Sequence, residues 1–161
     1  MKIIVSPAKT MVENSDSYIG SSIPTYIDYS LILLDEIRKK SYEEMKEIWK
    51  CNEKIAKENF DRFKNMNLQG SLTPAIFSYQ GIQYQYMAVN VMEAVAIEYI
   101  RENLYILSGF FGILRAFDAV SPYRLEMQAK MEIGKHKNLY EFWGDKIYKK
   151  LFEKDDVVIN L

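Results

Sequence analysis

A stretch of 21 residues, Leu107–Met127 (LSGFFGILRAFDAVSPYRLEM), places charged side chains inside an otherwise apolar sequence. The charged residues are Arg115, Asp118, Arg124 and Glu126. A charge buried without a partner costs several kcal/mol, so such a stretch folds only if each charge meets an opposite charge, solvent at a cleft, or a ligand. We therefore expect it to form either an internal ion-pair network or part of a binding site.

The composition is that of an ordinary globular chain. Its 161 residues suit one domain, 1–161, and 48% apolar with 27% charged residues argue against disorder. The formal net charge of −1 excludes a uniformly basic nucleic-acid-binding protein but allows a local basic patch. Cys51 and His136 are the only residues of their types, so one chain cannot assemble a Cys/His zinc site, and we assign no metal ligand. No window approaches the roughly 20 apolar residues of a membrane span, so we expect a cytoplasmic protein without a membrane partner.

Apolar runs and periodicities predict an α/β (α+β-like) fold, in which helices surround a mixed β-sheet. Strands are expected at Lys2–Val5, Ala75–Tyr79, Leu104–Leu107, Phe110–Leu114, Tyr123–Met127 and Val157–Leu161. A helix is expected over Ile27–Ile37, with Leu31 and Leu34 buried, and a second one begins at a capping box formed by Ser41 and Glu44. Further helices are expected over Asn52–Phe63, from Asn90 to Ile100, and from Asn138 to Leu151. Thr10–Ser22 is expected to be a loop.

The sequence Ser6–Lys9 (SPAK) directly follows the first expected strand. In α/β folds ligands collect at the carboxyl ends of strands, where the Ser6 hydroxyl, a backbone turn and the Lys9 ammonium would suit a phosphate. Alternatively, Pro7 only ends the strand and Lys9 is solvated. The residue types alone favour this second interpretation.

Two glycine-containing motifs give weaker signals. Gly81 opens a patch rich in amides and tyrosines, in which Tyr84 either stacks on a base or packs inwards, and packing is the better interpretation of the residues alone. Gly109 and Gly112 bracket two phenylalanines. That pattern is similar to the glycine hairpin of helix-hairpin-helix DNA-binding modules, although the spacing differs.

Arginines and carboxylates form the stronger candidate set. Arg124 and Glu126 would share one face of a strand, because alternate residues of a strand point the same way. The planar fork of arginine suits phosphate or carboxylate, and Arg115 offers a second one. Asp118, Glu126 and Asp145 are the candidate acidic groups. Asp145 is expected near a helix start, where a carboxylate is favourable for structural reasons alone.

The chain resembles the YaaA family, also called UPF0246, the peroxide stress resistance proteins. The resemblance rests on Ser6–Lys9, Gly81 with Tyr84, Leu107–Met127, Leu139–Asp145 (LYEFWGD) and Val157–Leu161 (VVINL). Three positions depart from the family pattern: Ile82 where an acidic residue is usual, Tyr86 in place of a glycine, and Ala116 in place of a proline. The first two departures argue against a binding role for the loop after Gly81, whereas Ala116 only loosens its turn.

The resemblance implies a YaaA-type α/β fold with a positively charged cleft and a helix-hairpin-helix-like element. It also implies cytoplasmic protection against hydrogen peroxide, through DNA binding and through limiting free iron. Family members continue past the last strand, so the chain is similar to the N-terminal part of a longer protein. The resemblance assigns no cofactor and no reaction.

Our leading hypothesis is a DNA-binding stress protein in which Ser6, Lys9, Arg115 and Arg124 meet phosphates in a cleft and Tyr84 offers a stacking surface. Such contacts would make affinity fall steeply with salt. The C-terminal strand would also be free to pair with a second copy, giving a homo-oligomer.

The rival hypothesis is an enzyme acting on a nucleotide or a phosphorylated substrate. The same cations would hold the anion, while Asp118, Glu126 or Asp145 would act as acid–base groups or bind a hard metal cation. In a third interpretation the charged residues of Leu107–Met127 are purely structural.

Overall fold

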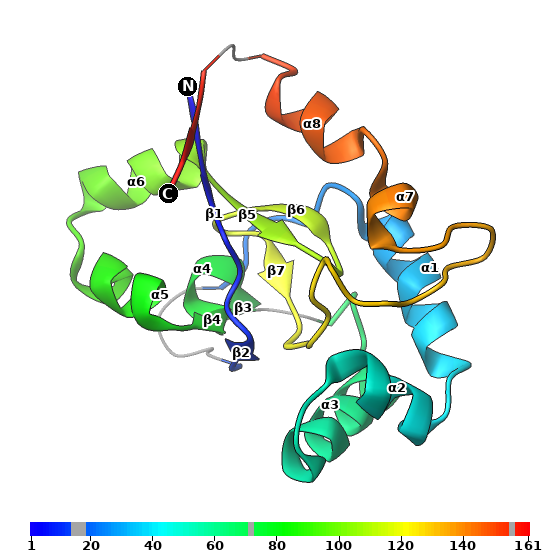
Figure 1. The fold of residues 1–161 in the computed structure, drawn as a ribbon. Helices are drawn as coiled ribbons and strands as arrows, with labels where there is room; N and C mark the ends of the chain where they lie inside the picture. The colour runs from blue at the N-terminus through cyan, green and yellow to red at the C-terminus, as the bar shows by residue number, and fades with distance from the viewer. Residues whose placement is uncertain (14–18, 71–72, 155–156) are drawn as a thin grey trace.

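The computed structural model shows a mixed β-sheet at the centre of the molecule (Figure 1). The structure describes residues 1–13, 19–70, 73–154 and 157–161. The sheet has the strand order β6-β5-β1-β8 and consists of β6 (Gly112–Arg115), β5 (Leu104–Ser108), β1 (Lys2–Val5) and β8 (Val158–Asn160). Strand β1 runs parallel to β5 and β8, whereas β6 is antiparallel to β5. The expected α/β fold class is confirmed.

The two faces of the sheet carry different apolar layers. In the β5–β6 pair, Leu107 lies opposite Ile113 and both belong to a small cluster with Leu151 of α8 (Lys146–Leu151). The neighbouring pair, Ile106 and Leu114, faces the main core instead. Because successive side chains of a strand point to opposite faces, both faces need cover. Figure 1 shows α6 (Ala94–Asn103) and α8 on opposite sides of the sheet.

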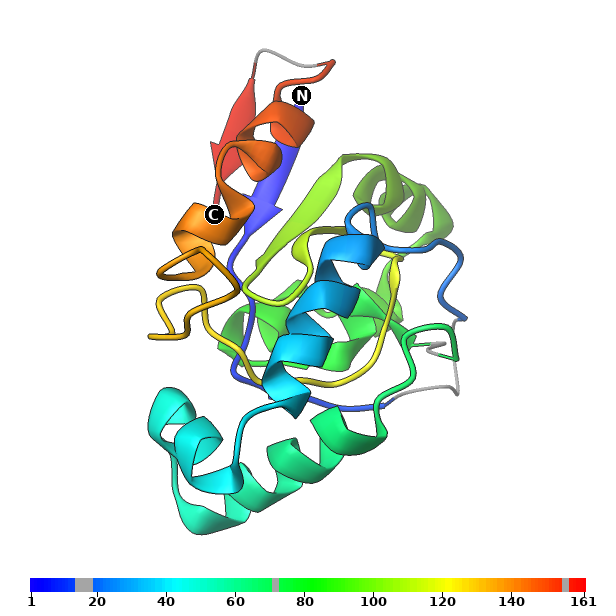
Figure 2. The same cartoon turned by 90° about the vertical axis from the view of Figure 1, so that its right-hand side faces the viewer.

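Three helices follow the N-terminal segment: α1 (Ile27–Arg38), α2 (Tyr42–Trp49) and α3 (Glu53–Asn65). The capping box at the start of α2 is confirmed, with the Ser41 side chain accepting from the Glu44 amide. Asn52 caps α3 in the same manner by accepting from Ile55. Figure 2 shows α1 in front of the sheet, with α2 and α3 paired below it.

The buried stripe of α1 differs from the prediction. Leu31 is exposed, whereas Leu33, Leu34 and Ile37 are buried with Ser30. The expected spacing is compatible with a helix, but the face that meets the sheet is rotated toward Leu33. The predicted helix is therefore confirmed, but the prediction of its buried face is partly wrong.

The expected strand Ala75–Tyr79 is wrong. Its first four residues form one helical turn, α4 (Ala75–Ser78), and all four are buried. A short apolar run that is buried on every side has no periodicity to separate a strand from a helix turn. Two-residue strands flank it: β3 (Thr73–Pro74), which pairs with β7 (Ala119–Val120), and β4 (Tyr79–Gln80), which pairs with β2 (Thr10–Met11). The expected loop Thr10–Ser22 thus begins with β2, and its residues 14–18 lie outside the described residues.

Other boundaries also differ. Phe110–Leu114 does not continue β5 but turns back as β6, and Tyr123–Met127 is irregular chain, not a strand. The patch after Gly81 is helix α5 (Ile82–Met87). Asn90 lies in the 3-10 turn η1 (Val89–Val91), and α6 begins later, after Glu93.

The last helical region is interrupted. Asn138 caps α7 (Leu139–Trp143) as expected, but Gly144, with φ of +53°, ends that helix before α8 begins. The C-terminal strand is confirmed as β8, which lies at an edge of the sheet in the described part of the chain. Its pairing with a second copy stays a prediction. None of the helices among the described residues is long and apolar enough to cross a membrane.

Candidate anion-binding site at the strand ends

The carboxyl ends of β1 and β5 meet at one edge of the sheet. The strands are parallel, and Val5 lies beside Ile106 in the register. The segment after β1, Ser6–Lys9, and the end of β5 with the next residue, Leu107–Gly109, therefore line a common hollow of about 480 Å³. We call it the strand-end hollow. It lies where ligands collect in α/β folds.

One wall of this hollow is the segment Leu125–Met127, which packs closely on Gly109 because glycine has no side chain. A Cβ atom on Gly109 would lie 2.3 Å from the backbone oxygen of Leu125, closer than any real contact. The backbone of Leu125–Met127 thus packs directly on the strand end, and it carries Arg124 and Glu126 to the hollow. Arg124 and Glu126 reach the site on irregular chain and not on the strand face that the sequence suggested.

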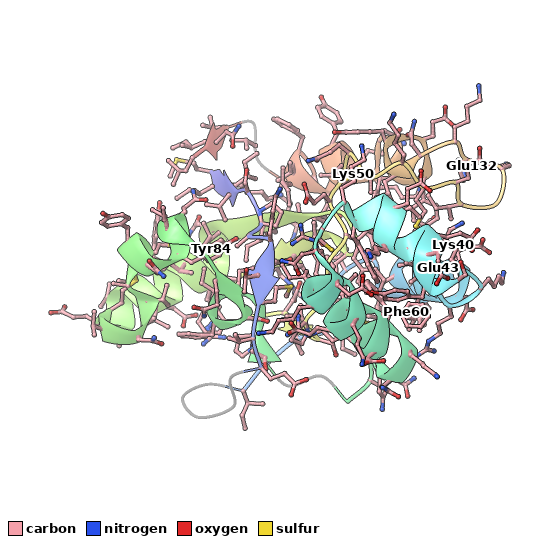
Figure 3. The ribbon with its side chains drawn as sticks, turned by 60° about the horizontal axis from the view of Figure 1, so that its bottom comes forward. Lys40, Glu43, Lys50, Phe60, Tyr84 and Glu132 are labelled. Carbon is pink, nitrogen blue, oxygen red and sulfur yellow. The ribbon has the colours of Figure 1, made fainter. Side chains whose placement is uncertain are left out.

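A second, smaller hollow of about 240 Å³ adjoins the first, and we call it the basic groove. Its lining comes from Ser6–Lys9, from the end of α2 and from the chain after β7: Lys9, Ile48, Trp49, Lys50, Arg124, Glu126, Gln128, Ala129 and Lys130. Four cationic side chains thus face one carboxylate. Figure 3 shows Lys50 at the end of α2, where its φ of 47° turns the chain before α3.

The carboxylate of Glu126 is shared by two cations. Its Oε1 lies 3.2 Å from Lys9 Nζ and 3.6 Å from Arg124 Nη2, while its Oε2 accepts from Gln128 Nε2 at 2.8 Å. The Lys9 side chain is 66% exposed, so its pair is worth about 0–1 kcal/mol. Lys9 is therefore free to turn to an arriving anion at small cost.

Two buried donors in the groove have no hydrogen-bond partner in the described part of the chain. They are Trp49 Nε1 and Arg124 Nε. Leaving a buried donor unsatisfied costs about 1–3 kcal/mol, so such a pair is unusual in a folded core. Both donors belong to side chains that line the basic groove. The four cationic side chains of the same lining suit the groove to an acceptor-rich guest.

Arg115 is not part of this site. Its Nε donates to Asp118 Oδ1 at 2.9 Å and its Nη2 to the Ile23 carbonyl at 3.0 Å. Arg115 pairs with Tyr105 in the sheet register, three residue pairs away from Ser108. That separation is about 10 Å along the strand. The structure brings Lys9 and Arg124 together but leaves Arg115 at the opposite end of the hairpin.

Asp118 completes an internal network around Arg115. Its carboxylate is fully buried and accepts from Ser22 Oγ at 2.6 Å and from the Arg115 amide at 2.8 Å. Burial raises the pKa of this carboxyl, although the hydrogen bonds and the guanidinium oppose the shift. Two of the four charged residues in Leu107–Met127, Arg115 and Asp118, therefore form the internal ion-pair network that was one of the two expectations.

Tyr84 supports the site from behind. Its side chain is buried, and its hydroxyl donates to the Ser6 carbonyl at 2.8 Å, which holds the turn after β1. In the view of Figure 3, Tyr84 and Lys50 lie on opposite sides of β1. Tyr84 lies outside the lining of both hollows, so the structure places it in a packing position and not on a stacking surface.

Asp145 also lies outside the lining of both hollows. It is exposed at the start of α8 and forms an ion pair with Lys149 at 2.6 Å. Hydrogen bonding to that ammonium lowers the pKa of the Asp145 carboxyl. Of the three acidic candidates, only Glu126 lines the hollows.

The helix-hairpin-helix interpretation of Gly109 and Gly112 is wrong at that position. Those glycines lie in the turn between strands β5 and β6, with Gly112 at φ of +73°. Helices α2 and α3, joined at Lys50–Asn52, do form a helical hairpin, and the end of α2 lines the groove. Trp49, Lys50 and Lys130 were missed in the sequence because they lie among charges typical of a solvated surface.

Fold and site together define an α/β protein with a cationic, partly enclosed hollow, a candidate anion site, at the carboxyl edge of its sheet. The family model for the peroxide stress protein YaaA matches residues 1–161. The chain therefore belongs to the YaaA family, and the predicted resemblance is confirmed.

Relatives extend this likeness to several bacteria. UPF0246 proteins are 55% identical in Lachnoclostridium phytofermentans, 52% in Ligilactobacillus salivarius and 51% in Agathobacter rectalis, each over 161 residues and 100% of this chain. The chain spans 63% of the first of these relatives and 65% of the other two.

Proposed function

We propose that the basic groove binds the phosphate backbone of DNA in a bacterial response to hydrogen peroxide. The observation that carries the proposal is the gathering of four cationic side chains around one carboxylate, Glu126, in the lining of the basic groove. Two side chains of that lining, Trp49 and Arg124, also carry buried donors without a partner among the described residues. Phosphate oxygens are the acceptors that an arginine fork binds best. Kinship with the peroxide stress proteins supports the biological setting.

Protection from iron-driven damage in the cytoplasm is the physiological part of the proposal, and it rests on kinship alone. Its test is separate from DNA binding. Peroxide survival and free iron are measured in cells that carry either the natural gene or a groove variant. Equal survival of both strains would remove the link between the groove and peroxide resistance.

The direct test is DNA binding by Arg124→Ala and Lys9→Ala across a salt series. Removal of a charge-assisted hydrogen bond from Arg124 to a phosphate should weaken binding roughly 10- to 100-fold. The slope of log affinity against log salt should become shallower by about 0.9 for each phosphate that the variant no longer neutralises. Lys149→Ala, which removes an exposed cation on α8, is the matched control. Unchanged affinity and slope in both groove variants would refute the proposal.

The enzyme alternative is supported by one observation, the size of the strand-end hollow. Its volume of about 480 Å³ lies within the range of small-molecule sites. Glu126 would be the acid–base group, since Asp118 and Asp145 lie outside the lining. Turnover of a phosphorylated compound that disappears in Glu126→Gln would favour this alternative.

A further inference from the structure

We propose that the strand-end hollow holds the base of one nucleotide whose phosphate lies in the basic groove. This inference rests on the proposed phosphate binding and assigns a ligand to the adjoining space. The chemistry it names is that of a nucleoside monophosphate unit. The unit belongs either to a free nucleotide or to an unpaired position in a DNA strand.

The two hollows adjoin each other and share part of their lining. Lys9, Arg124, Glu126 and Gln128 line both of them. A phosphate that satisfies the Arg124 fork therefore lies at the boundary between the hollows. A nucleoside attached to that phosphate enters the larger hollow, because the groove on the other side is only half its volume.

The lining of the strand-end hollow suits a flat, partly apolar ring. Apolar side chains of Leu107, Leu125, Met127 and Ile147 contribute to it. The ring of Tyr140, on α7, borders the same hollow and is exposed. Bases stack on such exposed aromatic faces regardless of their sequence.

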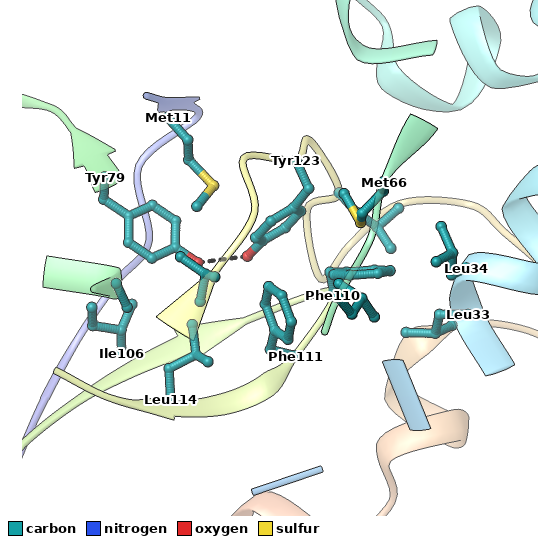
Figure 4. Close-up of a cluster of buried hydrophobic side chains, with 14 of the residues drawn as sticks. Met11, Leu33, Leu34, Met66, Tyr79, Ile106, Phe110, Phe111, Leu114 and Tyr123 are labelled. Atoms are coloured by element: carbon teal, nitrogen blue, oxygen red, sulfur yellow. Dashed lines mark hydrogen bonds between the residues drawn. The ribbon is translucent and has the colours of Figure 1, made fainter. Parts of the chain in front are cut away.

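A buried hydroxyl network forms the polar part of the wall. Tyr79 Oη lies 2.7 Å from Tyr123 Oη, which lies 2.6 Å from Ser108 Oγ (Figure 4). Ser108 Oγ also accepts from the Phe111 amide at 2.8 Å. Two hydrogen bonds between three hydroxyls use two of the three protons, so one proton is available for a further acceptor.

Two of the three hydroxyl residues belong to the lining of the hollow. Ser108 and Tyr123 line it, whereas Tyr79 does not. When Tyr79 donates to Tyr123, the remaining proton is on Ser108 or Tyr123, where a carbonyl oxygen or ring nitrogen of a base would accept it. Burial raises the pKa of Tyr123 to about 12, so this phenol keeps its proton at neutral pH.

The first experiment measures binding of inorganic phosphate, ribose 5-phosphate and nucleoside 5′-monophosphates by calorimetry. We expect at least one nucleoside monophosphate to bind at least tenfold more tightly than ribose 5-phosphate. Tyr123→Phe should remove most of that preference without changing the affinity for ribose 5-phosphate. Tyr148→Phe, at an exposed position of α8, should change neither the preference nor the affinity for ribose 5-phosphate. Should Tyr123→Phe fail to fold, Tyr140→Ala tests the same preference from the exposed rim.

The second experiment separates the two sources of the ligand. It compares a paired duplex, the same duplex with one unpaired nucleotide, and that duplex with an abasic residue at the unpaired position. Tighter binding of the unpaired base than of the abasic residue assigns the hollow to DNA. Tight binding of free nucleotide with equal binding of the three duplexes assigns it to a small molecule.

The failure of this inference is distinct from the failure of the proposed function. If ribose 5-phosphate binds as tightly as every nucleotide and the three duplexes bind equally, the base site is refuted. Phosphate binding by the groove is then still supported. Absence of binding to every phosphate compound and every duplex overturns both.

Discussion

Arg115 and Arg124 are nine positions apart in one stretch of sequence, yet their surroundings give them different roles. Arg115 neutralises the buried carboxylate of Asp118, and its Nη2 also donates to the Ile23 carbonyl. Arg124 shares its acidic partner, Glu126, with Lys9 and keeps a buried Nε–H without a partner among the described residues. In the sequence, each arginine is followed by a carboxylate two or three positions later, so the sequence does not distinguish them. The fold shows that Arg115 has a structural role and that Arg124 lies at the site.

Arg115→Ala tests this division. The substitution leaves the buried Asp118 carboxylate without its counter-charge, so we expect the free energy of unfolding to fall by about 1–3 kcal/mol, less than for a fully buried pair because Arg115 is partly exposed. DNA affinity, measured at a temperature where the variant is folded, should stay unchanged. Urea unfolding and a binding titration give the two quantities. Weaker binding with full stability would move Arg115 into the binding surface.

The buried phenols make stability depend on alkaline pH. Burial raises the pKa of Tyr123 to about 12, whereas a tyrosine of the unfolded chain ionises near about 10. The contribution of Tyr123 to stability is therefore fully present below pH 10 and is lost as the pH rises through 12, because the unfolded state releases its proton first. Urea unfolding between these pH values, compared for Tyr123→Phe and Tyr148→Phe, measures it. A decline that is the same in both variants would contradict the assignment.

At the scale of elements, the predictions succeeded where burial and sequence pattern agree. Lys2–Val5 is β-branched and lies between two parallel neighbours, and Ser41 with Glu44 forms a complete local signal for a helix start. Ala75–Tyr79 failed because its apolar run is buried on every side and short. Tyr123–Met127 failed because its backbone packs on Gly109 instead of on another strand, a contact that no local pattern in the sequence reveals.

Gly112→Ala tests the turn that sets the strand end. Gly112 has φ of +73°, and an added Cβ atom would lie 2.8 Å from the ring of Trp143. Backbone strain and overpacking together should lower the free energy of unfolding by about 2–4 kcal/mol. Gly134→Ala, with φ of +56° and no atom within 4 Å of the new Cβ, should cost about 1 kcal/mol from strain alone. Equal losses in denaturant unfolding would show that Trp143 yields without cost.

At the scale of the whole molecule, the site is a product of long-range assembly. The groove draws Lys9 from the turn after β1, Lys50 from the end of α2, and Arg124 with Lys130 from the chain after β7. Lys9 and Arg124 were candidates from the sequence, because one follows a buried strand and the other interrupts an apolar stretch, although the residue types alone favoured a solvated Lys9. Lys50 and Lys130 were not, since their sequence neighbours carry charges typical of a solvated face.

The charge balance of the groove is open to a direct test. Glu126 is the only carboxylate in its described lining and faces four cations, so Glu126→Gln raises the net positive charge. We expect DNA affinity to rise roughly fivefold at low salt, the size of one Coulomb interaction at about 4 Å in water. The gain should shrink at high salt, where exposed charges are screened. Glu132→Gln, an exposed carboxylate outside the groove, is the control. A fall in affinity for Glu126→Gln would mean that Glu126 positions the cations instead of competing for them.

Trp49 gives the protein an optical reporter of its own. The chain has two tryptophans, and the other one, Trp143, is buried with its indole nitrogen bonded to the Gly109 carbonyl at 3.0 Å. The indole of Trp49 lies stacked on Phe63, and its side chain lines the groove. An anion that accepts from the Trp49 N–H changes the surroundings of one emitter and leaves the other as an internal reference. Occupancy of the groove is thereby readable in unlabelled protein by intrinsic fluorescence.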